Sequence, residues 1–132
     1  METSIHHYDK ILQGAIKSIN KNDYLSQINK KVILEFSDYC LATGLTKARA
    51  AKYIYSLGTI GRILNKNFAD TNKDDIMRLM KEINVDTEYA EYAKKDFKVA
   101  LKKFYRWLRK TEDYPEEVKF LKTSMKKIGL LR

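Results

Sequence analysis

The sequence predicts an all-α protein, and two observations lead to this expectation. First, the 132 residues include a single proline, Pro115, and five glycines, whereas a β-sandwich or β-barrel needs many turn residues. Second, apolar residues recur with the 3.6-residue period of amphipathic helices in successive segments, and no segment alternates as a half-buried strand does. Because 44% of the residues are apolar, the chain also has enough hydrophobic side chains to fill a core.

The apolar periodicity predicts five helices and a short final one. The helices cover residues 8–19, 28–43, 46–65 and 87–110, with a shorter helix from a cap at Thr71 or Asn72 to Ile83 and a last one beginning at Tyr114 and Pro115. Gly44 is placed to follow the C-terminus of the second helix, and Thr46 is placed to cap the third. Gly58 and Gly61 either weaken the third helix locally or mark a close helix crossing.

The net charge of +9 comes from two separated segments. Residues 46–66 hold five basic and no acidic side chains, and residues 94–110 hold eight basic side chains and one acidic side chain. Between them, residues 67–93 hold three basic and seven acidic side chains. Positive charge concentrated in this way on a small protein is typical of a polyanion-binding surface.

The predicted helix over residues 87–110 has two faces of different chemistry. At about 100° per residue, its basic residues fall on one arc: Lys94, Lys95, Lys98, Lys102, Lys103, Arg106, Arg109 and Lys110. The opposite arc holds Ala90, Ala93, Phe97, Ala100, Leu101, Phe104, Trp107 and Leu108. We therefore expect the aromatic side chains to pack inward and the basic ones to form an outward ridge that binds a polyanion. The alternative interpretation is an ordinary solvated face.

The predicted helix over residues 46–65 has a similar polar face. Lys52, Tyr55, Thr59, Arg62 and Lys66 lie opposite its apolar stripe. Lys47 and Arg49 fall in the first turn, where the helix dipole disfavours cations, so helix stability does not explain them. A phosphate near the helix N-terminus does explain them. Tyr55 either adds a hydrogen bond to phosphate or base edges, or packs its ring on a neighbouring surface.

The sequence does not predict catalytic chemistry. His6 and His7 have no further metal ligand at a suitable spacing, Cys40 is expected in the core, and no glycine-rich phosphate loop occurs. We therefore expect no catalytic residue, no metal and no cofactor. A single cysteine, no apolar run of about 18 residues and no secretory signal together predict a cytoplasmic protein without membrane association.

Most of the sequence also resembles a known protein family. Four segments carry the resemblance in order: KKVILEFSDYCLATGLTKARAAKYIYSLGTIGRIL, DDIMRLMKEI, YAKKDFKVALKKFYRWLRK and YPEEVKFLK. They resemble the N-terminal SAM-like core-binding domain of tyrosine recombinases of the phage-integrase type, with archaeal members the most similar. The resemblance covers roughly residues 8–122.

The resemblance implies a small orthogonal bundle of about five helices that forms half of a clamp around a DNA recombination site. Residues 1–122 would be this DNA-binding domain, and residues 123–132 a basic tail or linker towards a catalytic domain. The family's catalytic arginine, His-x-x-Arg and tyrosine nucleophile have no match in this sequence. The implied protein binds double-stranded DNA, together with a recombinase catalytic domain or other recombinase protomers, does not cut DNA, and is a monomer when free.

The charge pattern and the resemblance select the same two helices, and we expect ten basic residues of these helices to bind DNA. They are Lys47, Arg49, Lys52, Arg62, Lys66, Lys94, Lys95, Lys98, Lys102 and Arg106. Charge alone does not separate DNA from RNA. The first alternative is a helical protein–protein interaction module with a basic surface, which predicts an exposed apolar patch. Its candidate residues are Ile33, Leu34, Leu41 and Ile63. A third, less favoured interpretation is binding of anionic lipid by the basic helix.

Overall fold

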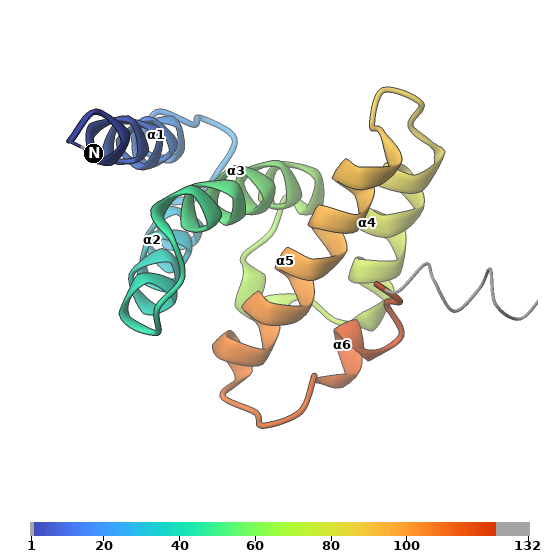
Figure 1. Ribbon diagram of the computed structural model, residues 1–132. Coiled ribbons are helices and arrows are strands. Elements are labelled where there is room, and N and C mark those ends of the chain that lie inside the picture. Colours follow the sequence, from blue (N-terminus) through green and yellow to red (C-terminus); the bar gives the residue numbers. More distant parts are fainter. Residues whose placement is uncertain (1, 124–132) are drawn as a thin grey trace, which may run out of the picture. The chain divides into compact units, whose positions relative to one another are not determined.

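The computed structural model describes residues 2–123, and its side chains are described from Asp9 onward. All of its elements are helices (Figure 1): α1 (Glu2–Asn20), α2 (Gln27–Ala42), α3 (Lys47–Leu64), the short 3-10 helix η1 (Phe68–Asp70), α4 (Lys73–Val85), α5 (Glu91–Arg109) and α6 (Glu116–Lys119). No strand occurs in residues 2–123, so the all-α prediction is confirmed. Nearly all of the predicted tail, residues 124–132, lies outside the described residues, as do the side chains of His6 and His7.

The chain divides into two compact units, Met1–Thr71 and Asn72–Arg132. We refer to them as the first and the second unit. The predicted domain over residues 1–122 therefore includes the whole first unit and most of the second.

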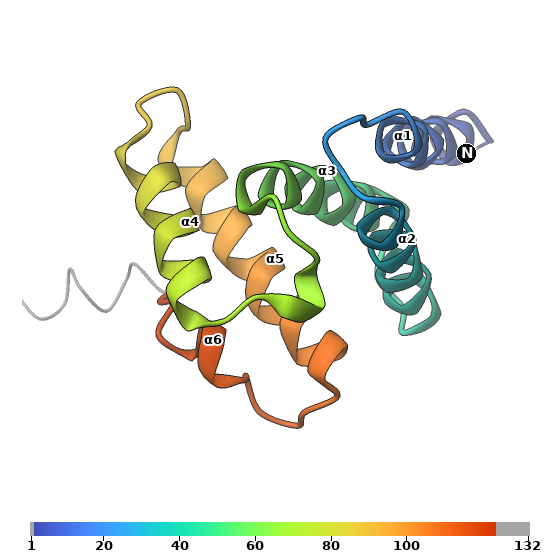
Figure 2. The same ribbon diagram turned by 180° about the vertical axis from the view of Figure 1, so that it is seen from behind.

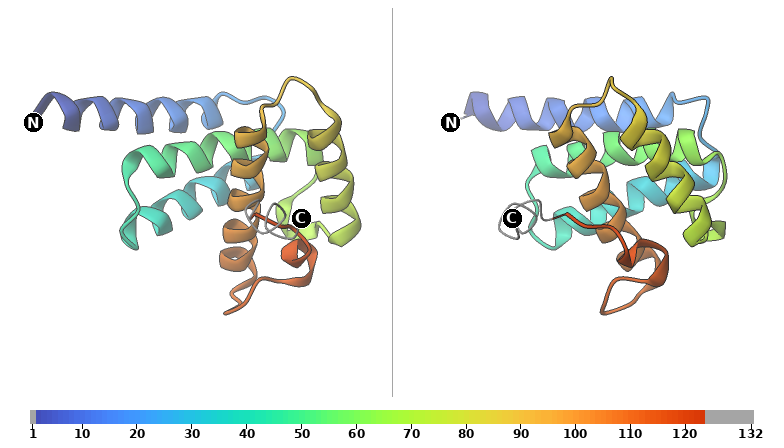
Figure 3. Two further views of the ribbon diagram at one scale, coloured as in Figure 1. Left: turned by 45° about the vertical axis from the view of Figure 1, so that its right-hand side comes forward. Right: turned by 90° about the vertical axis from the view of Figure 1, so that its right-hand side faces the viewer.

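In the first unit, α3 packs against both α1 and α2, and it runs beside α1 along much of its length (Figure 3). Two glycines allow this close packing. A Cβ atom at Gly58 would lie 3.0 Å from Ile19 Cδ1, and one at Gly61 would lie 2.6 Å from Leu25 Cδ2. The interpretation of a close helix crossing is therefore confirmed for Gly58, whereas Gly61 approaches Leu25 in the connection between α1 and α2.

Local capping signals explain where α2 and α3 begin and end. The Ser26 hydroxyl accepts a hydrogen bond from the Asn29 amide at 3.1 Å, and the Thr46 hydroxyl accepts one from the Arg49 amide at 3.2 Å. Gly44, just after α2, has φ of +103°, a conformation that favours glycine. The predicted roles of Gly44 and Thr46 are both confirmed.

In the second unit, α4 and α5 run in opposite directions, and α6 contacts both (Figure 2). Asn72 and Asp75 form a capping box at the start of α4. The helix expected from residue 87 begins only at Glu91, so that boundary prediction was wrong. The physical reason is that the Asp86 carboxylate accepts a hydrogen bond from the Glu88 amide at 2.8 Å, which favours a turn over a helix there.

The buried face of α5 is rotated relative to the predicted one. Phe97, Leu101 and Phe104 are buried as expected, but Tyr105, which the predicted apolar arc did not include, is fully buried. Trp107, expected in the core, is only half-buried, with its ring centroid 5.9 Å from that of Phe104. The expectation for Trp107 was therefore wrong, because the helix turns towards Tyr105 and places Trp107 at the edge of the buried face.

Candidate nucleic-acid interface

The polar face of α3 is solvent-accessible, as the sequence predicted. Four of its five predicted DNA-binding residues are exposed: Arg49, Lys52, Arg62 and Lys66. Lys47 differs because its ammonium forms an ion pair with Asp9 of α1. The positive charge of Lys47 is thus offset within the first unit.

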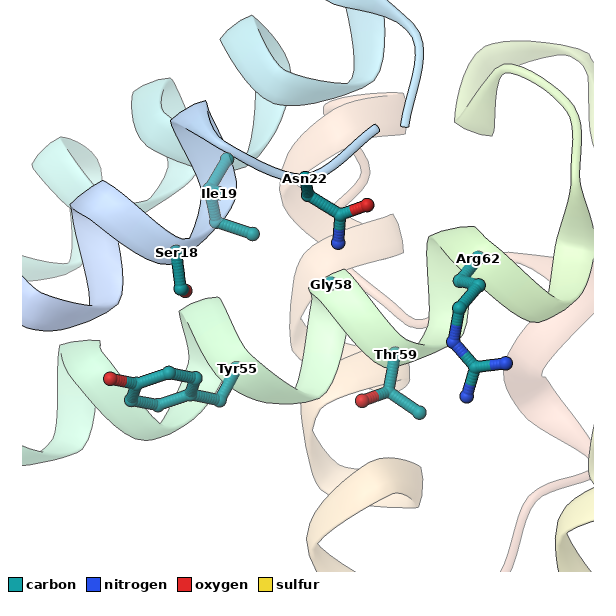
Figure 4. Close-up of a pocket in the computed structure, with 7 residues that line it drawn as sticks. All are labelled: Ser18, Ile19, Asn22, Tyr55, Gly58, Thr59 and Arg62. Carbon is teal, nitrogen blue, oxygen red and sulfur yellow. The ribbon is translucent and has the colours of Figure 1, made fainter. Parts of the chain in front are cut away.

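A groove of about 200 Å³ lies along this face, between α1 and α3 (Figure 4). Its lining residues are Ser18, Ile19, Asn22, Tyr55, Gly58, Thr59 and Arg62. Ser18 and Ile19 belong to the last turn of α1, Asn22 to the turn after it, and the other four to α3. The groove is smaller than a pocket for a drug-sized ligand, which usually has roughly 300–1,000 Å³. It therefore suits a small group such as a phosphate.

The chemistry of the groove favours an anion. Arg62 supplies guanidinium N–H groups, and the Thr59 and Tyr55 hydroxyls are further donors. The Asn22 side-chain oxygen accepts a hydrogen bond from the Tyr24 amide at 2.8 Å, and its amide nitrogen points towards α3 (Figure 4). None of the seven lining residues is acidic, so nothing in the lining repels a phosphate.

Glycines on both helices form the space for this groove. Gly58 brings α3 close to Ile19 of α1, and the hydroxyl of Tyr55 lies 3.6 Å from the position that a Cβ would take at Gly14. Tyr55 therefore leans its hydroxyl on the backbone of α1 while 49% of the residue stays exposed. This placement agrees with the packing interpretation of Tyr55, because its hydroxyl lies against α1 near Gly14. A hydrogen bond from Tyr55 to phosphate stays a prediction.

A buried asparagine fixes the C-terminal end of α3. The Asn29 side chain, in a residue that is 3% exposed, donates to the Lys66 carbonyl oxygen and accepts from the Phe68 amide, both at 3.0 Å. The Ser26 hydroxyl also lies 2.8 Å from the Asn67 side-chain oxygen. These hydrogen bonds hold the chain that leaves α3, and thereby the position of Lys66, against the start of α2.

Two lysines of the first unit were missed by the sequence analysis. Lys17 and Lys21 are exposed at the end of α1, and they neighbour Ser18 and Asn22 in the sequence. They were missed because the charge was summed over residues 1–45, which have no net charge. In that sum the acidic residues of the segment cancel the lysines. Their spacing of four residues, which places both on one side of α1, was the available signal.

The basic ridge of α5 is largely engaged within the second unit. The Lys94 ammonium donates to the Asn84 carbonyl oxygen at 2.9 Å, and the Lys102 ammonium donates to the Leu121 carbonyl oxygen at 3.0 Å. Lys94 has a side chain only 13% exposed. Arg106 places its guanidinium carbon 4.8 Å from the Tyr114 ring centroid.

The expectation of a fully outward ridge on α5 was therefore wrong for Lys94, Lys102 and Arg106. The physical cause is that carbonyl groups at helix ends and an aromatic face attract cations. Lys95 is exposed and Lys98 is half-exposed, so these two predicted residues stay on the accessible part of α5.

The described residues also bear on three other kinds of feature: a reactive cysteine, a metal site and a membrane-spanning helix. Cys40 is buried, as predicted. In the part of the chain that the structure describes, no three His, Cys, Asp or Glu side chains come together as metal ligands would. No described helix combines the length and apolarity that a membrane crossing requires.

Comparisons with protein families, with curated proteins and with solved structures found no match to this chain.

Proposed function

We propose that this chain binds double-stranded DNA through the basic face of α3 and the adjoining end of α1. The observation that carries this proposal is the α1–α3 groove, in which Arg62, Thr59 and Asn22 present hydrogen-bond donors and no carboxylate is present. The two helices and the residues that directly follow them also carry exposed cations: Lys17, Lys21, Arg49, Lys52 and Lys66. A donor-lined groove among several cations matches the spaced negative charges of a nucleic-acid backbone.

The proposed mechanism is backbone recognition. Arg62 donates two hydrogen bonds to one phosphate, because its planar fork fits two phosphate oxygens. Thr59 and Asn22 add neutral hydrogen bonds to the same phosphate, and the lysines offset neighbouring phosphates. Contacts of this kind set position and affinity more than sequence preference. In the second unit, Lys95 and Lys98 add further phosphate contacts.

Duplex DNA is favoured over a single strand by the aromatic residues on this face. Proteins that bind single strands stack bases on open aromatic rings. Tyr55, the aromatic residue of the groove, instead leans on α1 near Gly14, so it offers a hydroxyl more readily than a stacking platform. The resemblance to the core-binding domain of tyrosine recombinases supports the same choice, because that family places the equivalent helix on duplex DNA. The proposed role is therefore DNA clamping in recombination or integration, without strand cleavage.

A second candidate function is a protein interaction module. The residues expected to form its apolar patch do not do so, since Ile33 is fully buried and Leu34, Leu41 and Ile63 are half-buried. Three other apolar residues are exposed around α2 instead: Tyr24 (73%), Ile28 (58%) and Tyr39 (48%). Ile28 and Tyr39 lie on the same side of α2 by their spacing, which is the specific observation in favour of this alternative.

The test compares single substitutions that remove a groove donor with one that removes a distant charge. A labelled duplex of about 30 base pairs is titrated with wild type, Arg62→Gln, Thr59→Val and the control Lys31→Gln, which removes an exposed cation of α2. Arg62→Gln is expected to weaken binding about tenfold, the effect of losing a charge-assisted hydrogen bond. Thr59→Val, which keeps the side-chain shape, is expected to weaken it about threefold.

Lys31→Gln should change the affinity by less than a factor of about two, since it lies on another helix and alters only long-range charge. An equal loss from Arg62→Gln and Lys31→Gln would contradict the assignment of the groove. An absence of duplex binding by the wild type at low salt would contradict the proposed function and favour the interaction module.

A further inference from the structure

The segment that follows α5 folds back onto the basic face of that helix. Residues 111–117 contain four acidic side chains and no basic one. Glu117 accepts a hydrogen bond from the Arg109 Nε atom at 2.7 Å. Both members of this ion pair are well shielded, with side chains 26% and 14% exposed. Shielding of this degree makes the pair stronger than a fully exposed one.

Tyr114 covers two further cations of the same face. The Lys102 ammonium lies 4.5 Å from the centroid of its ring, and the guanidinium of Arg106 lies 4.8 Å from it. Cation–π contacts at these distances are favourable. The ring of one residue therefore lies over the two basic residues that the sequence analysis had assigned to DNA.

The same segment is anchored at its C-terminal end. Val118 is fully buried and Leu121 is 5% exposed, and the Lys102 ammonium donates to the Leu121 carbonyl oxygen at 3.0 Å. Pro115 fixes the backbone at the start of α6. The hydrophobic anchors hold the segment in place, while Glu112, Asp113 and Glu116 are exposed.

We propose that residues 112–117, the acidic segment, are an intramolecular competitor that occupies part of the DNA-binding surface of α5. This inference rests on the proposed function, because it concerns regulation of the same DNA binding. The Glu117 carboxylate contacts Arg109, and the Tyr114 ring contacts Lys102 and Arg106, where phosphates would otherwise bind. DNA must displace Glu117 and Tyr114 before these three cations contribute, so the second unit binds duplex weakly until the acidic segment is neutralised.

The test neutralises the acidic segment without removing its anchors. Glu116→Gln combined with Glu117→Gln is compared with Glu82→Gln combined with Glu88→Gln, two exposed residues elsewhere in the second unit. Both double variants raise the net charge by the same amount, so long-range attraction for DNA rises equally. A third variant, Tyr114→Leu, removes the ring from Lys102 and Arg106 and keeps an apolar side chain.

The Glu116/Glu117 variant is expected to bind a labelled duplex about fivefold more tightly than the Glu82/Glu88 control, the effect of releasing about one partly shielded ion pair. Its affinity should also fall more steeply with salt, because each cation that becomes available adds about −0.9 to the slope. Tyr114→Leu should shift affinity in the same direction. Equal affinities and slopes in the two double variants would overturn the proposal.

A measurement without DNA separates this inference from the proposed function. Brief acetylation of lysines, followed by mass spectrometry, compares Lys102 with its neighbour Lys103 on α5 in the full chain. In the wild type, Lys102 is expected to react more slowly than Lys103, and Tyr114→Leu should raise its rate several-fold. Equal acetylation rates for Lys102 in wild type and Tyr114→Leu would contradict the shielding of Lys102 by the Tyr114 ring. Failure of every variant to bind duplex, with Lys102 protected, would refute the proposed function, and the acidic segment would then have nothing to compete with.

Discussion

Gly61 allows the closest approach in the first unit, and its replacement by alanine should be destabilising. Alanine would normally stabilise a helix over glycine by about 1 kcal/mol. Here the new Cβ would lie 2.6 Å from Leu25 Cδ2 and 3.1 Å from Phe68 Cζ, well inside the distance of about 3.5–4.0 Å at which carbon atoms attract. Leu25 is 6% exposed and Phe68 is 1% exposed, so neither side chain has open space to move into.

Overpacking of this kind costs about 1–3 kcal/mol. After the gain in helix propensity of about 1 kcal/mol, Gly61→Ala should lower the free energy of unfolding by up to about 2 kcal/mol. Gly14→Ala is the matched control, since its new Cβ would meet only the Tyr55 hydroxyl at an ordinary 3.6 Å. It should raise the free energy of unfolding by about 0.5–1 kcal/mol.

Urea denaturation followed by far-ultraviolet circular dichroism measures both variants. The two substitutions should shift the unfolding midpoint in opposite directions. If Gly61→Ala were as stabilising as Gly14→Ala, the close packing of α3 against Leu25 and Phe68 would be refuted, and with it the framework that forms the groove.

Three further substitutions test individual contacts. Lys94→Met should destabilise the protein by about 1 kcal/mol in urea denaturation, because the Asn84 carbonyl oxygen loses its donor, and should leave duplex affinity nearly unchanged. Lys95→Met should leave the free energy of unfolding nearly unchanged and weaken duplex binding. Asn29→Ala should lower the free energy of unfolding by about 2–3 kcal/mol in the same assay, because it leaves the Phe68 amide and the Lys66 carbonyl group unpaired, and a loss below about 1 kcal/mol would contradict that role. Trp107→Ala should cost about 1–2 kcal/mol, less than the roughly 3–5 kcal/mol of a fully buried ring, and a larger loss would show that its ring is core after all.

The sequence was most informative where local signals determine the structure. Thr46 has the side chain that caps a helix, Gly44 has the backbone freedom that a helix end needs, and Gly61 interrupts an apolar stripe where another chain segment approaches. The roles of Thr46 and Gly44 depend on neighbours within a few residues, so the printed sequence contains nearly all of the relevant physics there, whereas the partner that approaches Gly61 is the distant Leu25. The exposed face of α3 followed from the same periodicity.

Contacts between distant residues explain what the sequence did not predict. Periodicity places Lys102 on the outward arc of α5, but it contains no information on the Leu121 carbonyl group or the Tyr114 ring that occupy it. The α1–α3 groove depends on the docking of two segments whose lining residues are more than 30 positions apart in the chain, and net charge per segment hid Lys17 and Lys21. Segment averages and helical arcs therefore predicted the exposed basic face of α3, but could not determine which basic side chains other parts of the fold already engage.

The most direct test of the central claim is the salt dependence of duplex binding by the wild-type chain. Six basic residues are exposed around the α1–α3 face: Lys17, Lys21, Arg49, Lys52, Arg62 and Lys66. If they offset about six phosphates, log K should fall against log salt with a slope near −5, and Arg62→Gln should make this slope shallower by about 1. A slope near zero, or tighter binding to a single strand or an RNA duplex of the same length, would contradict duplex DNA as the partner of this surface.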